Sequence, residues 1–352
     1  MYVDYIIVGQ GISGTWLSYY LSKAGKTVLV IDRENPLSPS RISAGVINPV
    51  TGRRHATVWM AEELLTHAWQ EYTELEKELG LRIIDRPAII DFFASPQMRL
   101  SFLERVAEQN AYLRLPANEN HFTGWFTYEF GFGEIQPAYI IHLNRLLSAW
   151  RNQLRQERKL LEEDFIPDHF SWTEKEVRYQ DHTASTLIFC DGNSSAQRDL
   201  FSTLPFAPNK GEMLILRIPG LPAGHIYKKG LTLVPHAEPD HWWVGASYEW
   251  EFENANPTAA FRQRTAAQLQ AWLQLPFTIL DHFAGLRPAT LERRPFVGLH
   301  PQHPTIGLLN GMGTKGCSLA PFFAKQLADH LLTGTPISPE ADISRFKRLL
   351  SR

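Results

Sequence analysis

The feature that most constrains this chain lies in its first 32 residues. An apolar run at 3–8 predicts a buried strand, and it leads directly into the glycine turn Gly9-Gln10-Gly11-Ile12-Ser13-Gly14. Apolar residues then recur at helical spacing, and the next apolar run, at 27–31, ends at Asp32. Strand, glycine turn, helix and second strand in this order predict a Rossmann-like α/β unit.

Each glycine of the turn has a separate physical role. Gly9 makes the tight turn, Gly11 lets the backbone approach a pyrophosphate, and Gly14 allows the helix to pack against the sheet. The helix amino end attracts phosphate charge, while Asp32 can accept a hydrogen bond from a ribose hydroxyl. A glycine turn alone would be weak support, because many loops match it by chance. Here every part of the dinucleotide-binding motif falls where the motif requires it.

Length and composition describe an ordinary globular protein of two domains. The chain has 352 residues, of which 44% are hydrophobic and 20% are charged, and this length exceeds a usual single core. The formal net charge of −2 provides no global basic field, so neither nucleic acid nor an anionic membrane is an expected partner. We expect no signal peptide before the first strand, and no apolar run reaches the length of a membrane span.

The cysteines and histidines predict no metal site. Cys190 and Cys317 form no metal-binding or disulfide pattern, which is typical of a reducing compartment, and we therefore expect a cytoplasmic protein. His300 and His303 have a metal-like spacing, but no third ligand is in view, so a solvated loop is favoured. Cys317 opens a predicted helix, where a thiol pKa can be lowered, although buried packing is the commoner role.

The order of predicted elements indicates interleaved domains. After a long loop at 33–54 and a helix at 58–79, strand and helix no longer alternate. A helix opened by Pro137 and an apolar strand at 185–190 indicate a return to the first domain. Later runs at 212–218, 230–235 and 241–247 predict three antiparallel strands.

We therefore expect an α/β fold in which a Rossmann-like dinucleotide-binding domain is interleaved with an α+β substrate domain that contains an antiparallel sheet. The dinucleotide-binding domain is predicted to comprise residues 1–85, 137–205 and 284–352. The substrate domain is predicted to comprise residues 86–136 and 206–283, and the ligand is expected between the two.

Four later segments carry recognisable motifs. Residues 40–49 read SRISAGVINP, 185–192 read STLIFCDG, 285–290 read GLRPAT, and 310–316 read NGMGTKG. Together with the opening motif they resemble the D-amino-acid oxidase family of FAD enzymes, which includes glycine and sarcosine oxidases. In that family the segment corresponding to 40–49 passes the flavin ring, and the segment corresponding to 185–192 returns to the adenosine side. The segment corresponding to 285–290 carries a G-x-R-P motif, and the segment corresponding to 310–316 closes over the flavin.

The resemblance implies an FAD-dependent oxidoreductase. Sarcosine oxidases tether their flavin to a cysteine at the late G-x-R-P segment; this chain has none there, so we expect FAD to be bound without a covalent link. The residues expected to hold FAD are Gly9, Gly11, Ile12, Ser13, Gly14, Asp32, Arg33, Ser40, Ala44, Gly45, Val46, Asp191, Gly192, Gly285, Gly311, Met312, Gly313, Thr314, Lys315 and Gly316.

Within the family, residues 245–248, 285–290 and 313–316 are similar to the flavin half of a bacterial bifunctional enzyme. That enzyme trims the carboxymethylaminomethyl group of a tRNA wobble uridine. The present chain has no methyltransferase half, so a stand-alone oxidase is the simpler expectation. Thr232 precedes Leu233-Val234-Pro235 at a place where amine-oxidising relatives often carry tyrosine, and this leaves the identity of the substrate open.

Three residues are the candidates for binding substrate or stabilising charge. Arg287 has a guanidinium fork that suits a carboxylate, and the resemblance implies an arginine at this place above the flavin. Tyr248 could assist through its hydroxyl, and Lys315 would add charge to a glycine loop whose N–H groups lie at a helix amino end. Each has an ordinary alternative: a structural ion pair for Arg287, packing for Tyr248 and a solvated side chain for Lys315.

The expected reaction is dehydrogenation of the C–N bond of a small amine or amino acid by hydride transfer to flavin N5. This scheme requires no side-chain base, and the electron acceptor, O₂ or a quinone, is open. A rival function is oxidation of a 2-hydroxy acid, with His55 or His142 as the base. A second rival is a tRNA-modifying flavoenzyme that acts on a glycine-like group, which would require a basic rim. A third is a flavin-binding protein without turnover.

Overall fold

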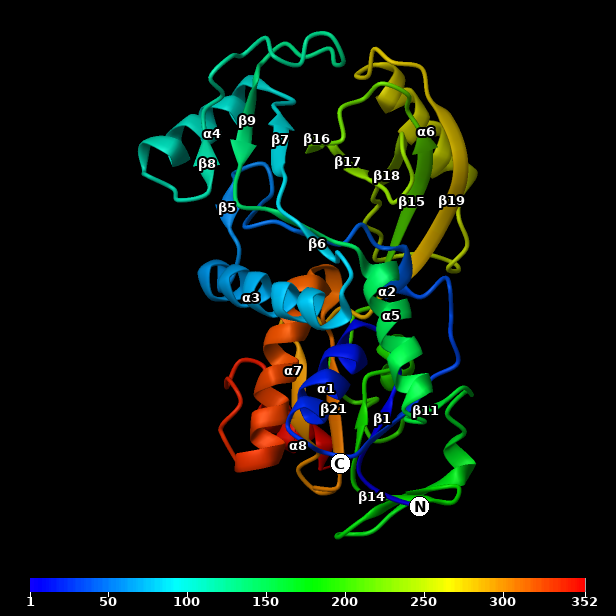
Figure 1. The fold of residues 1–352 in the computed structure, drawn as a ribbon. Coiled ribbons are helices and arrows are strands. Elements are labelled where there is room, and N and C mark those ends of the chain that lie inside the picture. Colours follow the sequence, from blue (N-terminus) through cyan, green and yellow to red (C-terminus); the bar gives the residue numbers. More distant parts are fainter. Residues whose placement is uncertain (352) are drawn as a thin grey trace.

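The computed structural model describes residues 1–351 and contains two large β-sheets (Figure 1). In the view of Figure 1 the first sheet lies in the lower part, where the chain begins, and the second sheet lies in the upper part. Among residues 1–351, no helix is long and apolar enough to cross a membrane.

The first sheet has a parallel core. Its strands are β1 (Tyr2–Val8), β2 (Val28–Ile31), β11 (Leu160–Leu161), β12 (Phe170–Trp172), β13 (Val177–Tyr179), β14 (His182–Phe189), β20 (Phe296–Leu299) and β21 (Ile306–Asn310). β1 pairs in parallel with β2 and β14, and β11 and β21 continue the parallel pairing on either side. β20 adds an antiparallel edge, and the β12–β13 hairpin pairs with the first half of β14.

Three long helices pack on this sheet, α1 (Ile12–Lys23), α5 (Leu143–Gln156) and α7 (Gly316–Thr333), and a fourth, α3 (Ala61–Leu79), packs on α7. α1 packs against α7, with Trp16 and Leu17 fully buried. The helix approaches the glycine turn so closely that a Cβ on Gly14 would lie 1.9 Å from the Gly9 carbonyl oxygen. Only glycine fits there, which explains why the third glycine of the turn is needed for packing.

The second sheet is antiparallel except for one pair. In spatial order its strands are β19 (Thr278–Arg287), β15 (Asn209–Arg217), β18 (His241–Gly245), β17 (Leu231–Pro235), β16 (His225–Lys229), β7 (Ala88–Phe92), β9 (Phe132–Ile135) and β8 (Leu113–Arg114). Only β16 and β7 run parallel. Its connections include α4 (Pro96–Ala107) and α6 (Ala259–Gln270), whose N-caps Ser95 and Thr258 accept a bond from a first-turn N–H.

Short elements join the two sheets. A three-stranded sheet contains β3 (Val46–Ile47), β10 (Tyr139–Ile141) and β6 (Ile84–Asp85), and a hairpin contains β4 (Val50–Thr51) and β5 (Ala56–Thr57). The remaining helical turns are α2 (Pro39–Ile42), α8 (Lys347–Leu350), η1 (Pro167–His169), η2 (Gly192–Gln197), η3 (Gly313–Lys315) and η4 (Ile343–Phe346). α2 packs on β19 and thereby connects the loop after β2 to the second sheet.

The structure corrects three local predictions. The helix predicted to open at Pro137 begins at Leu143, because Tyr139–Ile141 pairs as a strand with β3 and β6; three apolar residues in a row suit a buried strand as well as a helix. No strand was predicted at 225–229, where the structure has β16. The loop predicted at 300–303 is present, but His300 within it is not solvated: it is 3% exposed, and burial together with His303 lowers its pKa to about 4.

The strands of the second sheet come from residues 88–135 and 209–287. The two-part boundaries of the substrate domain, at 86–136 and 206–283, are close to these limits but stay a prediction. Whatever the exact boundary, α2 and the strands β15 and β19 bring the two sheets together at one place, and this place contains a large cavity.

Candidate active site

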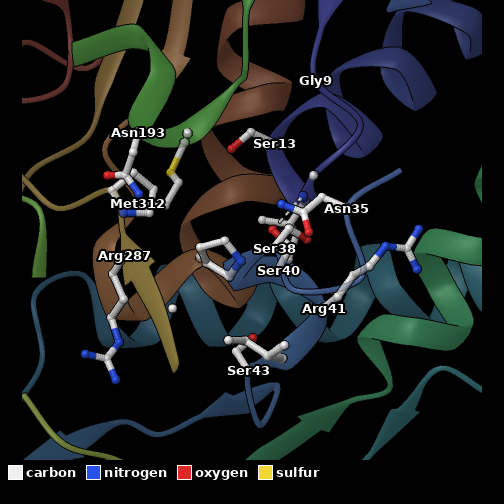
Figure 2. Close-up of a pocket in the computed structure, with 18 of the residues that line it drawn as sticks. Gly9, Ser13, Asn35, Ser38, Ser40, Arg41, Ser43, Asn193, Arg287 and Met312 are labelled. Atoms are coloured by element: carbon white, nitrogen blue, oxygen red, sulfur yellow. Dashed lines mark hydrogen bonds between the residues drawn. The ribbon is translucent and has the colours of Figure 1, made fainter. Parts of the chain in front are cut away.

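A cavity of about 820 Å³ is lined by residues from both large sheets. In the view of Figure 2, Ser38, Ser40 and Arg41 lie at one side, and Arg287 lies at the other. The predicted residues that line the cavity are Gly9, Gly11, Ile12, Ser13, Asp32, Arg33, Ser40, Ala44, Gly45, Val46, Asp191, Gly192, Tyr248, Gly285, Arg287, Met312, Gly313, Thr314 and Gly316. Gly14, Gly311 and Lys315 are not in this lining.

The glycine turn leaves backbone open to the cavity. Gly9 has a φ of +98°, and a Cβ there would lie 2.7 Å from the Cys190 carbonyl oxygen. Ser40 approaches from the loop after β2, and its Oγ accepts a bond from the Ile12 N–H at 3.2 Å. These features form the kind of cradle in which a pyrophosphate can approach the backbone at a helix amino end.

Asp32, at the end of β2, is held by the protein itself. Its carboxylate accepts bonds from the Gln10 N–H at 2.8 Å and from Arg151 at 2.6 Å. Arg151 lies on α5, is 2% exposed and also reaches Glu162 at 3.2 Å. Since each carboxylate oxygen can accept two bonds, Asp32 can still bind a ribose hydroxyl. The sequence analysis missed Arg151, although a charge among the apolar residues of a buried helix face is a usable signal.

A second ion pair follows β14. Asp191 pairs with Arg198 at 2.7 Å and accepts a bond from Ser195. The Arg198 guanidinium carbon lies 4.7 Å from the ring centre of Phe165 and 4.6 Å from that of Phe189. Arg198 and Phe165 line the cavity but were not predicted from the sequence. They give this end of the cavity a flat cation and an aromatic ring.

In the closing glycine loop, at 310–316, three backbone N–H groups that the sequence suggested as donors to a ligand are bonded within the protein. The Gly311 N–H donates to Asn310, the Gly313 N–H to the Pro288 carbonyl and the Lys315 N–H to the Met312 carbonyl. These three N–H groups therefore do not face a ligand. Gly311 itself packs against Thr290, whose methyl would lie 2.6 Å from a Cβ at this position.

Lys315 lies in a separate cavity of about 20 Å³, which is also lined by Asn48, Pro49 and Leu64. Burial, together with Arg294 and Arg293, lowers the pKa of the Lys315 ammonium to about 8. Its predicted role in the chemistry stays a prediction, and the structure directs its side chain toward α3 rather than into the large cavity.

Arg287 ends β19 and is partly buried in the large cavity. It donates to Asn209 Oδ1 at 2.6 Å, to the Lys210 carbonyl at 3.4 Å and to the Ser247 carbonyl at 3.1 Å. All three acceptors are neutral, and no carboxylate within residues 1–351 pairs with this guanidinium. Burial lowers the pKa of Arg287, and the opposing effects of Tyr248 and Glu249 do not outweigh the loss of water around the cation.

Tyr248 flanks Arg287 at the edge of the cavity. Its ring centre lies 5.6 Å from the guanidinium carbon, and its far side packs edge-on against Trp250 at 5.3 Å. Tyr248 is 48% exposed, so its hydroxyl is available to a ligand or to water. The side chains that complete this end of the cavity are Met213, Thr232, Trp243, Ala246 and Ser247.

A family model described as FAD dependent oxidoreductase (DAO) matches residues 4–330. The chain belongs to the DAO family. Our sequence-based assignment to the D-amino-acid oxidase family, and with it the expectation of an FAD-dependent enzyme with a Rossmann-like fold, is confirmed. The chain is therefore an FAD-dependent oxidoreductase of the DAO family.

Two curated relatives of the chain differ in the activity that their names give. The chain is 25% identical to a glycine oxidase of Pseudomonas putida, over 98% of both chains. It is 24% identical to the tRNA 5-methylaminomethyl-2-thiouridine biosynthesis bifunctional protein MnmC of Hahella chejuensis, over 94% of this chain and 57% of that protein. The structure also resembles a crystal structure of glycine oxidase from Geobacillus kaustophilus, with a TM-score of 0.75, 17% identity and coverage of 97% and 98%.

The residues of the large cavity fit the cofactor of the DAO family. The open backbone at Gly9 and Gly11 suits a pyrophosphate, and Asp32 suits a ribose. The loop at 40–46 crosses the cavity under constraint: Gly45 has a φ of +71°, and a Cβ there would lie 2.0 Å from the Ile141 carbonyl oxygen. Glycine at this place allows the loop to lie directly against β10.

Proposed function

We propose that this protein oxidises the C–N bond of a small amino acid or N-substituted glycine. The observation that carries the proposal is the guanidinium of Arg287, which lies in the FAD cavity and is bonded only to neutral oxygens. A partly buried cation that is bonded to no anion is costly, and a bound carboxylate would reduce that cost. When bound, FAD supplies a hydride acceptor at N5 and so performs the redox chemistry.

The chain's own contribution is to bind and orient the substrate. Arg287 binds the carboxylate, and Tyr248 covers the guanidinium from the solvent side and offers its hydroxyl. The substrate carbon next to the nitrogen is then presented to the cofactor with a neutral amine, so that loss of hydride gives an imine that water hydrolyses. Binding at the carboxylate, away from the reacting carbon, orients that carbon without a bond to it.

The identity of the groups near Arg287 supports an amine rather than a 2-hydroxy acid. A hydroxy acid requires a base for its hydroxyl proton, but no histidine lines the cavity as described for residues 1–351. His55 is 1% exposed and packs against Phe102, and His142 pairs with Asp85 at 3.0 Å. Neither of the two histidines considered from the sequence is placed to act as that base.

Anaerobic mixing of the FAD-loaded protein with a panel of ligands tests the proposal. The panel contains amino acids, N-alkyl glycines, the corresponding amines without a carboxylate, and 2-hydroxy acids. We expect bleaching of the flavin absorbance with one or more amino acids or N-alkyl glycines, and little with the amines. Bleaching by hydroxy acids alone would overturn the proposal. Repeating the productive reaction with O₂ and with a soluble quinone identifies the electron acceptor.

A further inference from the structure

Asn209 lies directly across the sheet from the candidate carboxylate-binding residue. It opens β15, and the register of the antiparallel pair places it opposite Arg287 of β19. Asn209 is fully buried. Its Oδ1 accepts the bond from Arg287 at 2.6 Å, and its Nδ2 donates to the Glu249 carbonyl at 2.8 Å. One amide therefore joins the guanidinium to the chain segment that contains Tyr248.

The same segment is bound to β15 by its backbone. Glu249 and Lys210 exchange two N–H to carbonyl bonds of 2.9 Å, and the Ser247 carbonyl accepts from Arg287 at 3.1 Å. Asn209 is the side chain within this arrangement that touches both Arg287 and the 247–249 backbone. It can do so because an amide has both an acceptor oxygen and donor hydrogens.

The neutrality of Asn209 matters as much as its geometry. An aspartate has nearly the same shape, but at 2.6 Å from a partly buried guanidinium its charge would form an ion pair and satisfy Arg287 internally. With asparagine, Arg287 is held in place while its charge stays uncompensated. Of the five N–H donors of an arginine, three have the protein acceptors described above, so two remain for a ligand.

We propose that Asn209 is a positioning residue that fixes the guanidinium fork of Arg287 toward the substrate carboxylate and, by being neutral, keeps its charge available to that carboxylate. This inference rests on the proposed function of Arg287. It assigns specificity for a carboxylate ligand to a buried residue on a neighbouring strand, which does not itself touch the ligand.

The test uses Asn209→Asp in the FAD-loaded protein, with acetate as the probe ligand. Acetate carries the carboxylate but no oxidisable amine, and its binding is followed through the change it causes in the flavin absorption spectrum. We expect the dissociation constant of acetate to rise by at least about tenfold, the size expected when an opposite charge is neutralised at close range. With a productive substrate, KM should rise similarly while kcat changes by less than about threefold.

The matched control is Asn152→Asp. Asn152 is exposed on α5, and its Oδ1 likewise accepts a bond from an arginine, Arg155, at 2.9 Å. This substitution adds the same charge to the same kind of contact, between two residues that do not line the cavity. It should leave acetate binding and KM unchanged.

Arg287→Ala distinguishes a failure of the role of Asn209 from a failure of the proposed function. If Arg287→Ala weakens acetate binding but Asn209→Asp does not, the role of Asn209 is overturned and the proposed function stands. If Arg287→Ala has no effect on acetate, the proposed function fails and the inference fails with it. Should Asn209→Asp fail to retain FAD, the neutral Asn209→Ser decides instead. It should bind acetate several-fold more weakly with kcat retained, and unchanged affinity or loss of FAD would show that Asn209 is only structural.

Discussion

The guanidinium of Arg287 occupies the space in which a side chain at position 211 would lie. A Cβ on Gly211 would lie 1.9 Å from Nη2 of Arg287, so the guanidinium rests on the bare backbone of β15. Gly211 lies two residues after Asn209 on β15, and its pairing partner on β19 is Gly285. Two paired glycines therefore line the cavity beside Arg287: the missing Cβ of Gly211 makes room for the guanidinium, and that of Gly285 makes room for Ile42 of α2.

Gly211→Ala should displace Arg287 while leaving the nucleotide end of the cavity intact. We expect KM for a carboxylate substrate to rise by about tenfold or more, because a misplaced binding group lowers affinity and orientation together. FAD occupancy should be retained. The comparison is steady-state kinetics beside Gly124→Ala, since Gly124 is exposed and has open space around its missing Cβ. Equal KM values in the two variants would show that Arg287 is not placed by Gly211.

Arg287→Lys and Arg287→Ala should differ in a defined way. Lysine keeps the charge but loses the planar fork, so the main effect should be a higher KM. Alanine leaves the substrate carboxylate unpaired in a partly dry site, and kcat/KM should fall by about 2–5 kcal/mol. Both variants should hold FAD normally. If Arg287→Ala oxidises a carboxylate substrate as well as the parent does, Arg287 is structural.

FAD should be bound tightly and without a covalent link. Denaturation with acid or heat should release the flavin into the supernatant, and addition of FAD to protein stripped of flavin should raise its unfolding temperature in proportion to the logarithm of the ligand excess. Flavin that stays with the precipitated protein would contradict the non-covalent assignment. The tethering residue would then be found by mass spectrometry of flavin-containing peptides.

The pKa of Lys315 predicts a pH effect on stability. Its folded-state pKa of about 8 lies below the unfolded value of about 10.4, so the unfolded chain binds more protons between these pH values. The unfavourable contribution of Lys315 is therefore fully present below pH 8 and is relieved as pH rises toward about 10. Lys315→Met should be more stable than the parent at pH 7, and the difference should shrink at pH 10. Thermal unfolding at both pH values, with the exposed Lys175→Met as control, checks this.

Binding to tRNA separates the small-molecule function from a tRNA-modifying one. A tRNA enzyme contacts phosphates, so its affinity falls steeply with salt. We expect little binding from a chain of net charge −2, and the exposed acids Glu251 and Glu253 that follow Tyr248 in the chain oppose it further. Filter binding of unmodified tRNA at low and moderate salt is the measurement. Salt-sensitive binding at micromolar or lower concentration would favour the tRNA-modifying function.

The sequence by itself determined the Rossmann-like unit and the presence of FAD. These features can be recognised from residues close together in the chain: glycines at 9, 11 and 14 follow an apolar run directly, and a second apolar run ends in Asp32. Arg287 could be predicted as a carboxylate-binding residue in the same way, because its residue type and its motif can both be recognised in the amino-acid sequence.

Only the tertiary structure decided what surrounds these residues. Strand register brings Asn209 and Gly211 to Arg287 and, because side chains alternate along a strand, a shift of one residue would turn both away. The direction in which a side chain leaves its loop decided that Thr314 lines the large cavity and Lys315 does not. Arg151 meets Asp32 only because α5 packs beside β2. Such contacts join residues far apart in the chain, so no local pattern could have placed them.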